Sequence, residues 1–340
     1  MRLLERFLHP RVASASPRST NEGVEPHRFF TAGDIVIPVI GPTGTGKSTF
    51  INTILEVERS GAEANGQGLL GVGKGLRSCT REITPVKIKS LDDPRILYPM
   101  AIKDRSVMVV DTPGFDDTCT EDVQVLRKIA TWLKKSYEER KTVAGVLYLH
   151  DISQDRFTGS VRKNLELFRR LCGREAFSQV VIVMTKGEKL HPQIASKYEY
   201  ELRSEHWRDL IDAGATVLGF KRNYRSARSI IDHVLRGLTR KFILQLQKEL
   251  VIQKKLLPAT EAGKHLKTTL QQVLALQSTV LDMTCAMATT EEENAGELEE
   301  RLRELRDEMK ILSEQITTLR DGSVPYSNTF FCCTRNLLHN

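Results

Sequence analysis

The stretch GPTGTGKST, at positions 41–49, decides how the rest of the chain folds. It fits the G-x-x-x-x-G-K-[ST] phosphate-binding loop at every fixed position. An apolar, β-branched run of strand length, DIVIPVI at 34–40, precedes it, and STFINTILEV at 48–57 can continue as a helix. A glycine-rich turn with a chance lysine would not need this strand–loop–helix context, so the sequence predicts a nucleotide site here.

The residues of this loop have separate roles in holding a phosphate. Glycines let backbone N–H groups turn inward around the phosphate oxygens, and the following helix directs its positive end at the same anion. Lys47 is expected to reach the β- and γ-phosphates, and the Ser48 hydroxyl is expected to bind Mg²⁺. The predicted nucleotide-binding residues of the loop are Gly41, Pro42, Thr43, Gly44, Thr45, Gly46, Lys47, Ser48 and Thr49.

A second nucleotide signature follows the run SVMVVD at 106–111, which continues as TPGFDD. Asp111 would hold Mg²⁺ through water, and Gly114 would give its backbone N–H to the γ-phosphate, which can approach closely only where there is no side chain. Asp-x-x-Gly is common by itself. At the end of a strand, downstream of a phosphate loop, it is a specific signal.

A third signature, TKGE at 185–188, follows the apolar run QVVIVM. It is similar to the [NT]-K-x-D sequence that reads guanine in GTPases, with Glu188 in place of the aspartate. A carboxylate here can accept two hydrogen bonds from the guanine N1–H and N2–H₂ groups, and adenine offers no such pair. Thr185, Lys186 and Glu188 are therefore the predicted base-side residues, and a solvated loop is the alternative.

Apolar strands alternate with helical patterns between about 33 and 235, which predicts a parallel α/β sheet flanked by helices. Strands are expected at 34–40, 82–89, 106–111, 143–149, 179–184 and 215–220, and helices at about 47–57, 120–137, 160–172 and 193–213. Right-handed crossovers would put the ligand at the carboxyl ends of the strands. The segment 222–227 is expected to close over the base.

In this order, the three signatures and Thr80 resemble the translation-factor-related P-loop GTPases, and most of all their septin-like, immunity-associated group. That group includes septins and the chloroplast outer-envelope import GTPases, and the stretch 145–173 looks like uncharacterised fungal G-domain-containing proteins. The resemblance covers about 33–235. It implies binding of GTP and GDP with Mg²⁺, slow hydrolysis, and dimerisation through the nucleotide face.

The resemblance also assigns site residues. Thr80 matches the switch threonine that contacts Mg²⁺ and the γ-phosphate, so Lys47, Thr80 and Gly114 are the expected catalytic residues. Ser48, Thr80 and Asp111, the last through water, are the expected metal-binding residues. Phe115 stands where Ras-like enzymes have a water-orienting glutamine. Turnover near or below about 10⁻⁴ s⁻¹ is therefore expected.

The predicted function is a slow GTPase that serves as a switch or assembly module and is activated by dimerisation. Two alternatives stay open: a GTP-binding scaffold with little hydrolysis, and an ATPase, which rests on Glu188. His150 is either a structural residue or one that positions water or contacts a partner. Arg156 is either a solvated charge or a residue supplied across a dimer.

Composition sets further bounds. The net charge is +7, and no basic run is interleaved with aromatic residues, so nucleic-acid recognition is not expected. Six cysteines without a C-x-x-C pair favour a reduced, cytoplasmic protein, with peripheral membrane contact as an option. Residues 1–32 are expected to form a flexible basic tail, and a mitochondrial transit peptide is the lesser alternative. Cys332 and Cys333, in a flexible tail at 321–340, are either acylated or idle thiols.

Residues 236–320 are expected to be helical and partly coiled coil. Pro258 and Gly263 are predicted to separate two helices. A heptad seam follows. The helix that carries it is expected either to pair with a partner or to fold back on the G domain. The residues of the seam are Leu298, Leu302, Leu305, Met309, Leu312, Ile316 and Leu319.

Overall fold

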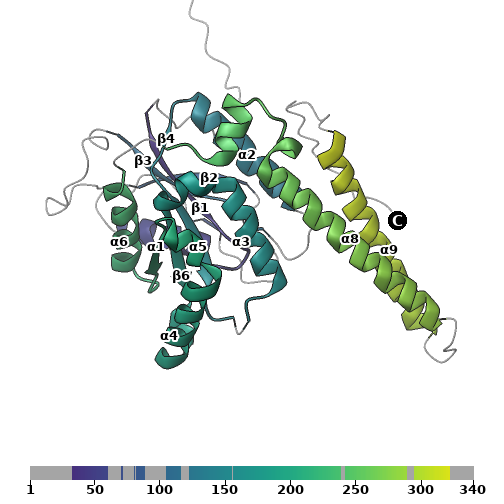
Figure 1. The fold of residues 1–340 in the computed structure, drawn as a ribbon. Helices are drawn as coiled ribbons and strands as arrows, with labels where there is room; N and C mark the ends of the chain where they lie inside the picture. Colours follow the sequence, from purple (N-terminus) through teal and green to yellow (C-terminus); the bar gives the residue numbers. More distant parts are fainter. Residues whose placement is uncertain are drawn as a thin grey trace, which may run out of the picture. The chain divides into compact units, whose positions relative to one another are not determined.

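A computed structural model describes residues 33–59, 70–71, 80, 82–88, 105–115, 122–154, 156–238, 242–288 and 295–321 (Figure 1). Several predictions lie outside these residues. They concern the tails at 1–32 and 322–340, with Cys332 and Cys333. Most of 61–75, a stretch with six glycines, also lies outside the described residues.

The expected mostly parallel sheet is confirmed, with seven strands in the described part of the chain. Its order is β2-β3-β1-β5-β6-β7, and a two-residue strand, β4 (Thr142–Val143), pairs with β1. The parallel strands are β1 (Ile35–Ile40), β3 (Val107–Asp111), β5 (Val146–Asp151), β6 (Val180–Thr185) and β7 (Thr216–Gly219). The edge strand β2 (Thr84–Ile88) is antiparallel to β3. β4 was not predicted, because two residues carry no periodicity.

Helices cover both faces of this sheet, as Figure 1 shows. On one face, α1 (Lys47–Arg59) and α6 (Tyr224–Arg236) share a buried apolar cluster with alternate strand residues such as Leu147 and Leu149. On the other face, Tyr148 of β5 packs against Phe168 of α3 (Gly159–Cys172), with ring centroids 4.5 Å apart. Successive strand residues point to opposite faces, so one apolar strand serves both layers.

The helix expected at about 193–213 is divided, which corrects the prediction. It consists of α4 (Pro192–Glu201), one π-helical turn at Leu202–His206, and α5 (Arg208–Asp212). The Trp207 N–H donates to the carbonyl of Leu202 over 2.8 Å, which is the wide i→i−5 pattern of a π turn. The indole of Trp207 is fully buried, so the wide turn accompanies the inward placement of this side chain.

The predicted helix break at Pro258 and Gly263 is only half right. Pro258 lies in a short 3₁₀ turn, but Gly263 lies inside the first turn of α8 (Glu261–Ala288). A Cβ added at Gly263 would be 2.1 Å from the carbonyl oxygen of Leu257, so glycine is needed there for close approach, not for a break. The buried Glu249 carboxylate accepts the Glu261 N–H and thereby caps the start of α8.

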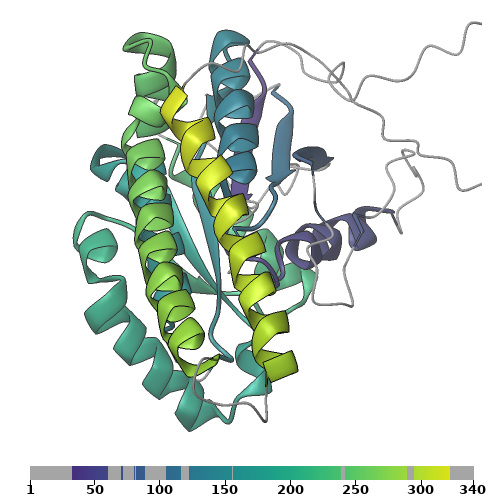
Figure 2. The same cartoon turned by 90° about the vertical axis from the view of Figure 1, so that its right-hand side faces the viewer.

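The heptad seam is covered within the same chain. It lies on α9 (Ala295–Asp321), which packs against α8 to form a helical hairpin (Figure 2). Leu305, Leu312 and Leu319 are at most 5% exposed, and Gln277 of α8 donates to Glu308 of α9 over 2.7 Å. The partner that the seam was predicted to want is therefore supplied by α8 of the same chain, and not by the sheet domain. Among the described helices, none has both the length and the apolar character to cross a membrane.

Candidate nucleotide-binding site

The phosphate-binding loop connects β1 to α1 at the carboxyl edge of the sheet, where it was expected. Gly41 has φ 153°, and a Cβ there would be 2.5 Å from the carbonyl oxygen of Leu149 in β5, so only glycine fits. The Lys47 ammonium group is buried over the loop and donates to the carbonyl oxygens of Gly41 and Pro42, over 3.0 and 2.9 Å. A cation is thus fixed beside the start of α1, whose free N–H groups favour an anion.

Three predicted metal-binding residues meet at this edge. Both the Ser48 and the Thr80 hydroxyl donate to Oδ2 of Asp111, over 2.7 and 3.1 Å, and the two hydroxyl oxygens are 3.0 Å apart. They come from the first turn of α1, the segment before β2, and the end of β3. Because β2 is antiparallel to β3, with Thr84 opposite Asp111, the chain before β2 reaches the same edge at which β3 ends.

The electrostatics of Asp111 favour a cation. Its side chain is buried, and burial raises the pKa of this carboxyl above its usual range, against the hydrogen bond from Ser48 and the charge of Lys47. Its Oδ1 has no hydrogen-bond partner among the residues that the structure describes. Carboxylate and hydroxyl oxygens are hard donors of the kind that Mg²⁺ prefers. This set of oxygen donors includes Oδ1 of Asp111, which makes no hydrogen bond to a described residue, and it therefore fits Mg²⁺.

Gly114 and Phe115 lie directly against the phosphate-binding loop. The Thr43 N–H donates to the carbonyl of Phe115 over 3.1 Å, and Pro42 and Phe115 form a parallel bridge. A Cβ at position 114 would be 2.4 Å from Oγ1 and 2.7 Å from the backbone nitrogen of Thr43. The Phe115 side chain is only 1% exposed, so it supplies no polar group to the site.

The base-side signature is tied to the same loop. Oγ1 of Thr185, at the end of β6, is 2.9 Å from the carbonyl oxygen of Thr45 and 3.1 Å from that of His150. Lys186 has a left-handed backbone, with φ 59° and ψ 17°. Its ammonium group pairs with Oδ2 of Asp151 at 2.5 Å. Glu188 is exposed on a single 3₁₀ turn and has no hydrogen bond or ion pair to any described residue.

Two residues of this region were not predicted. Asp151 ends β5 beside Thr185; burial raises its pKa, but hydrogen bonds from Lys186 and Ser153 outweigh burial and leave the pKa below its usual range. Its place at the end of a strand was the signal that could have revealed it. Asn52 of α1 makes two hydrogen bonds with the backbone of Leu70, both 2.9 Å long, and so anchors one residue of the glycine-rich stretch.

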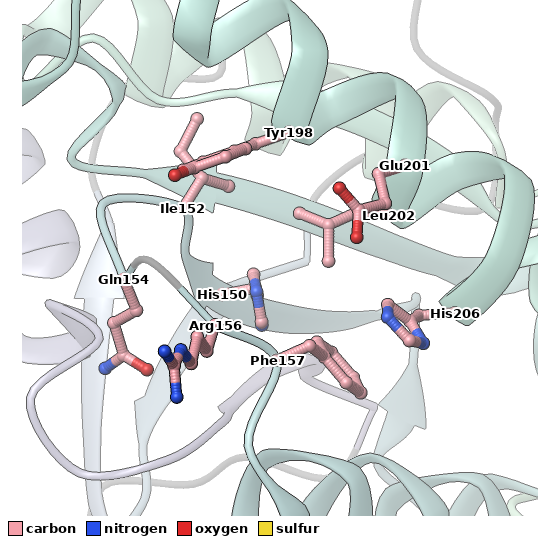
Figure 3. A pocket seen from close by; sticks show the side chains of 9 residues that line it. All are labelled: His150, Ile152, Gln154, Arg156, Phe157, Tyr198, Glu201, Leu202 and His206. Carbon is pink, nitrogen blue, oxygen red and sulfur yellow. The ribbon is translucent and has the colours of Figure 1, made fainter.

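A small aromatic pocket lies beside this site, between the loop after β5 and the end of α4 (Figure 3). Phe157 stacks on His206 with ring centroids 3.7 Å apart, and His150 meets Trp207 edge to face at 5.2 Å. Burial lowers the pKa of His150 to about 4. His150 is therefore a neutral packed residue, which agrees with the structural alternative for it.

The two loops expected to complete the site differ from each other. Arg156 is exposed, and no hydrogen bond or ion pair joins it to the described part of the chain. The base-closing loop predicted at 222–227 is shorter than expected, because Asn223 caps α6 by accepting the Ser226 N–H over 2.9 Å. Residues 224–227 are therefore helical, and only 221–223 form a loop.

Solved structures resemble the chain at low sequence identity. Toc33 from Arabidopsis thaliana in complex with Mg²⁺ and GMPPNP is 16% identical, with a TM-score of 0.45, over 62% of this chain and 88% of that one. Translation elongation factor SelB from Methanococcus maripaludis in complex with the GTP analogue GPPNHP is 12% identical, with a TM-score of 0.38, over 64% of this chain and 36% of that one. Among curated proteins, no sequence matches the chain.

A family model also matches the chain. The model of the AIG1 family matches residues 35–218, which begin at the first residue of β1 and end within β7. This match contains the phosphate-binding loop, Asp111, Gly114 and the TKGE signature. It spans more than half of the 340 residues. The chain therefore belongs to the AIG1 family.

Proposed function

We propose that the chain binds GTP and GDP with Mg²⁺, hydrolyses GTP slowly, and acts as a switch or assembly module. The observation that carries this proposal is the meeting of Ser48, Thr80 and Asp111 beside Lys47. Toc33 was solved with Mg²⁺ and a GTP analogue, and with GDP. For this chain we propose the same ligands on its own residues. A cytoplasmic location is part of the proposal and rests on composition.

Each residue has a role in this proposal. Lys47 and the loop N–H groups bind the β- and γ-phosphates, and Gly114 brings a backbone N–H to the γ-phosphate. Ser48, Thr80 and Asp111 would hold Mg²⁺, which neutralises charge on the phosphate oxygens when it is bound. Lys186 and Glu188 would contact the guanine. The Thr185 hydroxyl keeps the base side and the phosphate side in register through the carbonyl of Thr45.

Titration with a fluorescent GTP analogue tests the binding step. Lys47→Ala should weaken binding at least about tenfold, because a charge-assisted hydrogen bond contributes about 1.5–3 kcal/mol. Lys197→Ala, which removes an exposed lysine from α4, is the matched control and should leave affinity unchanged. Equal affinity of the Lys47→Ala variant and the parent would overturn the assignment of the loop.

Slow hydrolysis and its activation form the second part of the proposal. Phe115 has no group that could orient water, so a second copy docked on the nucleotide face would have to complete the site. Arg156 is the candidate, because it is exposed in the loop that follows β5 at the carboxyl edge. A charge supplied in trans raises the rate by about 10³–10⁵ in related reactions. For the chloroplast translocon components atToc33 and psToc159, dimerisation is important for the GTPase activity.

Turnover per molecule should therefore rise with protein concentration, and Arg156→Ala should remove the rise without weakening nucleotide binding. Arg174→Ala, which removes an exposed arginine from the 3₁₀ turn at Arg174–Gln179, is the control. A flat dependence in the parent, together with parent-like turnover in Arg156→Ala, would rule out activation through Arg156 of a second copy. If no phosphate is released even in a single turnover, the alternative of a GTP-binding scaffold replaces the slow GTPase, and the buried Phe115 is the observation that favours it.

A further inference from the structure

An apolar stripe on the distal half of α8 is left largely exposed by the described part of the chain. Leu276, Val280 and Met283 are 66%, 46% and 62% exposed. Their spacing of four and then three residues places them on one face of the helix. The sequence from 268 to 281, TTLQQVLALQSTVL, has no charged residue. We call Leu276, Val280 and Met283 the α8 stripe.

The side of α8 opposite the stripe is occupied. Leu274, Leu281 and Cys285, which fall on the side opposite the stripe, are only partly exposed, and α9 packs along α8. Near its start, α8 packs on α3: Glu261 pairs with Arg170 at 3.4 Å, and His265 lies beside Lys163. By helical periodicity the stripe continues the face of α8 that carries His265. The stripe therefore lies on the same face of α8 that packs on α3, beyond the part of that face that α3 covers.

The stripe lies beyond the start of α3. Because Glu261 is next to Arg170 and His265 is next to Lys163, the two helices are antiparallel. Leu276 is about 16 Å further along α8 than His265, at 1.5 Å per residue, whereas Lys163 is only about 6 Å from the start of α3 at Gly159. α3 follows β5, so its start lies at the nucleotide edge of the sheet. The hairpin in Figure 1 runs past α3 in this direction.

We propose that the α8 stripe is a homodimer contact and that its occupant is the same stripe of a second copy. A two-fold contact places one patch against itself, so an uncharged patch avoids meeting its own charges. The outer face of α9 is charged, with Glu300, Arg303, Glu304 and Asp307 all exposed, so it is less suited to this contact. The spacing of the stripe also suits side chains that interdigitate between two helices.

A lipid surface fits the stripe less well. Helices that lie in a membrane interface carry lysine and arginine along their polar face. Around the stripe, the exposed side chains of α8 are Gln271, Gln272, Ala275, Thr279 and Asp282, and the exposed charges of α9 are of both signs. The patch therefore lacks the basic border that anionic lipids attract.

A dimer held by two hairpins would have a further consequence, which rests on the proposed function. The stripe lies beyond the nucleotide edge, so two paired hairpins would keep two nucleotide faces near each other at a raised effective concentration. The contact between the nucleotide faces could then be weak and still form when GTP is bound.

The test is sedimentation velocity of the full chain without nucleotide. The parent should show a concentration-dependent dimer, and the double variant Leu276→Gln with Val280→Gln should raise the dimer dissociation constant at least about tenfold. Glutamine keeps helix propensity. Leu256→Gln is the matched control, since Leu256 is 62% exposed outside the stripe, and it should leave the dimer unchanged.

Two more measurements separate the outcomes. Circular dichroism and the affinity for a GTP analogue should match the parent in both variants. A parent that binds no GTP analogue would count against the proposed function and not against the stripe. A monomeric parent, or an unchanged dimer in the double variant, would overturn the homodimer. Sedimentation of a monomeric parent with phosphatidylcholine vesicles, lost in the double variant, would also overturn it and assign the stripe to lipid.

Discussion

The hydroxyl of Ser48 donates to Oδ2 of Asp111 over 2.7 Å, and this hydrogen bond joins the phosphate-binding loop directly to the end of β3. The acceptor is a buried carboxylate, and burial raises its pKa. An ionised carboxylate in such a place destabilises the fold unless a cation or donors compensate it. The same pair of residues thus favours metal binding and weakens the metal-free protein.

Asp111→Asn should therefore stabilise the protein without Mg²⁺ and abolish the extra stability that Mg²⁺ adds to the nucleotide complex. The folded carboxyl has a raised pKa, so its stability is fully present below the unfolded value of about 3.9 and falls as pH rises through the folded pKa. The advantage of the variant should accordingly be absent at low pH and present at neutral pH. Thermal unfolding at several pH values, with exposed Asp209→Asn as control, measures it.

Gly114→Ala should separate the two loops that meet at Thr43. The added Cβ would lie 2.7 Å from the Thr43 backbone nitrogen, a contact that no side-chain rotation can relieve. We expect unfolding free energy to fall by about 1–3 kcal/mol and GTP turnover to fall at least about tenfold. Gly219→Ala is the control, since a Cβ at that position meets no atom within 4 Å. Parent-like turnover in Gly114→Ala would show that the contact is not needed.

The preference for guanine over adenine should depend on Glu188. It should also depend on Asp151, which acts through Lys186. Glu188→Ala should lower GTP affinity about tenfold or more and leave ATP affinity unchanged. Asp151→Asn should lower GTP affinity as well, because it weakens the ion pair that holds Lys186 in its left-handed conformation. Competition between the nucleotides measures both, with exposed Glu175→Ala as control. Equal affinity of the parent for GTP and ATP would favour the ATPase.

His150 should make the fold sensitive to acid. Its folded pKa is about 4, below the ordinary 6.5, because the ring is buried next to Trp207. Its contribution is therefore complete above about pH 6.5 and is lost as pH falls toward 4, by up to about 3 kcal/mol. Asp151 raises this pKa and His206 lowers it further.

His150→Phe should flatten the fall in stability between pH 6.5 and pH 4. Urea unfolding at a series of pH values is the measurement, and exposed His191→Gln is the control. The same acid sensitivity in parent and His150→Phe would show that other groups, such as His206, account for it.

The phosphate side of the site was predictable because each of its motifs ends or begins a regular element. Gly41–Thr49 and Gly114 follow parallel strands and Asp111 ends one, and parallel strands bring their carboxyl ends to one edge. Thr80 was assigned by resemblance to a family, and the structure places it there through the antiparallel strand β2. Side-chain pairs such as Lys186 with Asp151 were not predictable, since they join residues far apart in sequence without a repeating pattern.

The helical region shows what periodicity leaves undecided. The seam of α9 indicates that leucines such as Leu305 need an apolar partner, but it does not say which chain supplies it. α8 has two apolar faces, so its pattern is broad, and its stripe could be recognised only after α9 had been seen to cover the other face. The turn at Leu202–His206 was missed for another reason, because a π turn has no sequence signal as regular as that of an α-helix.

The burial of Trp207 has a practical consequence. The sequence contains two tryptophans. Trp207 lies edge-on to His150, and His150 is the second-last residue of β5, the strand that borders the phosphate-binding loop. In a Trp132→Phe background its fluorescence would come from this point alone. The protein thus contains its own optical reporter at the nucleotide edge, which would allow stopped-flow measurement of nucleotide arrival without an attached dye.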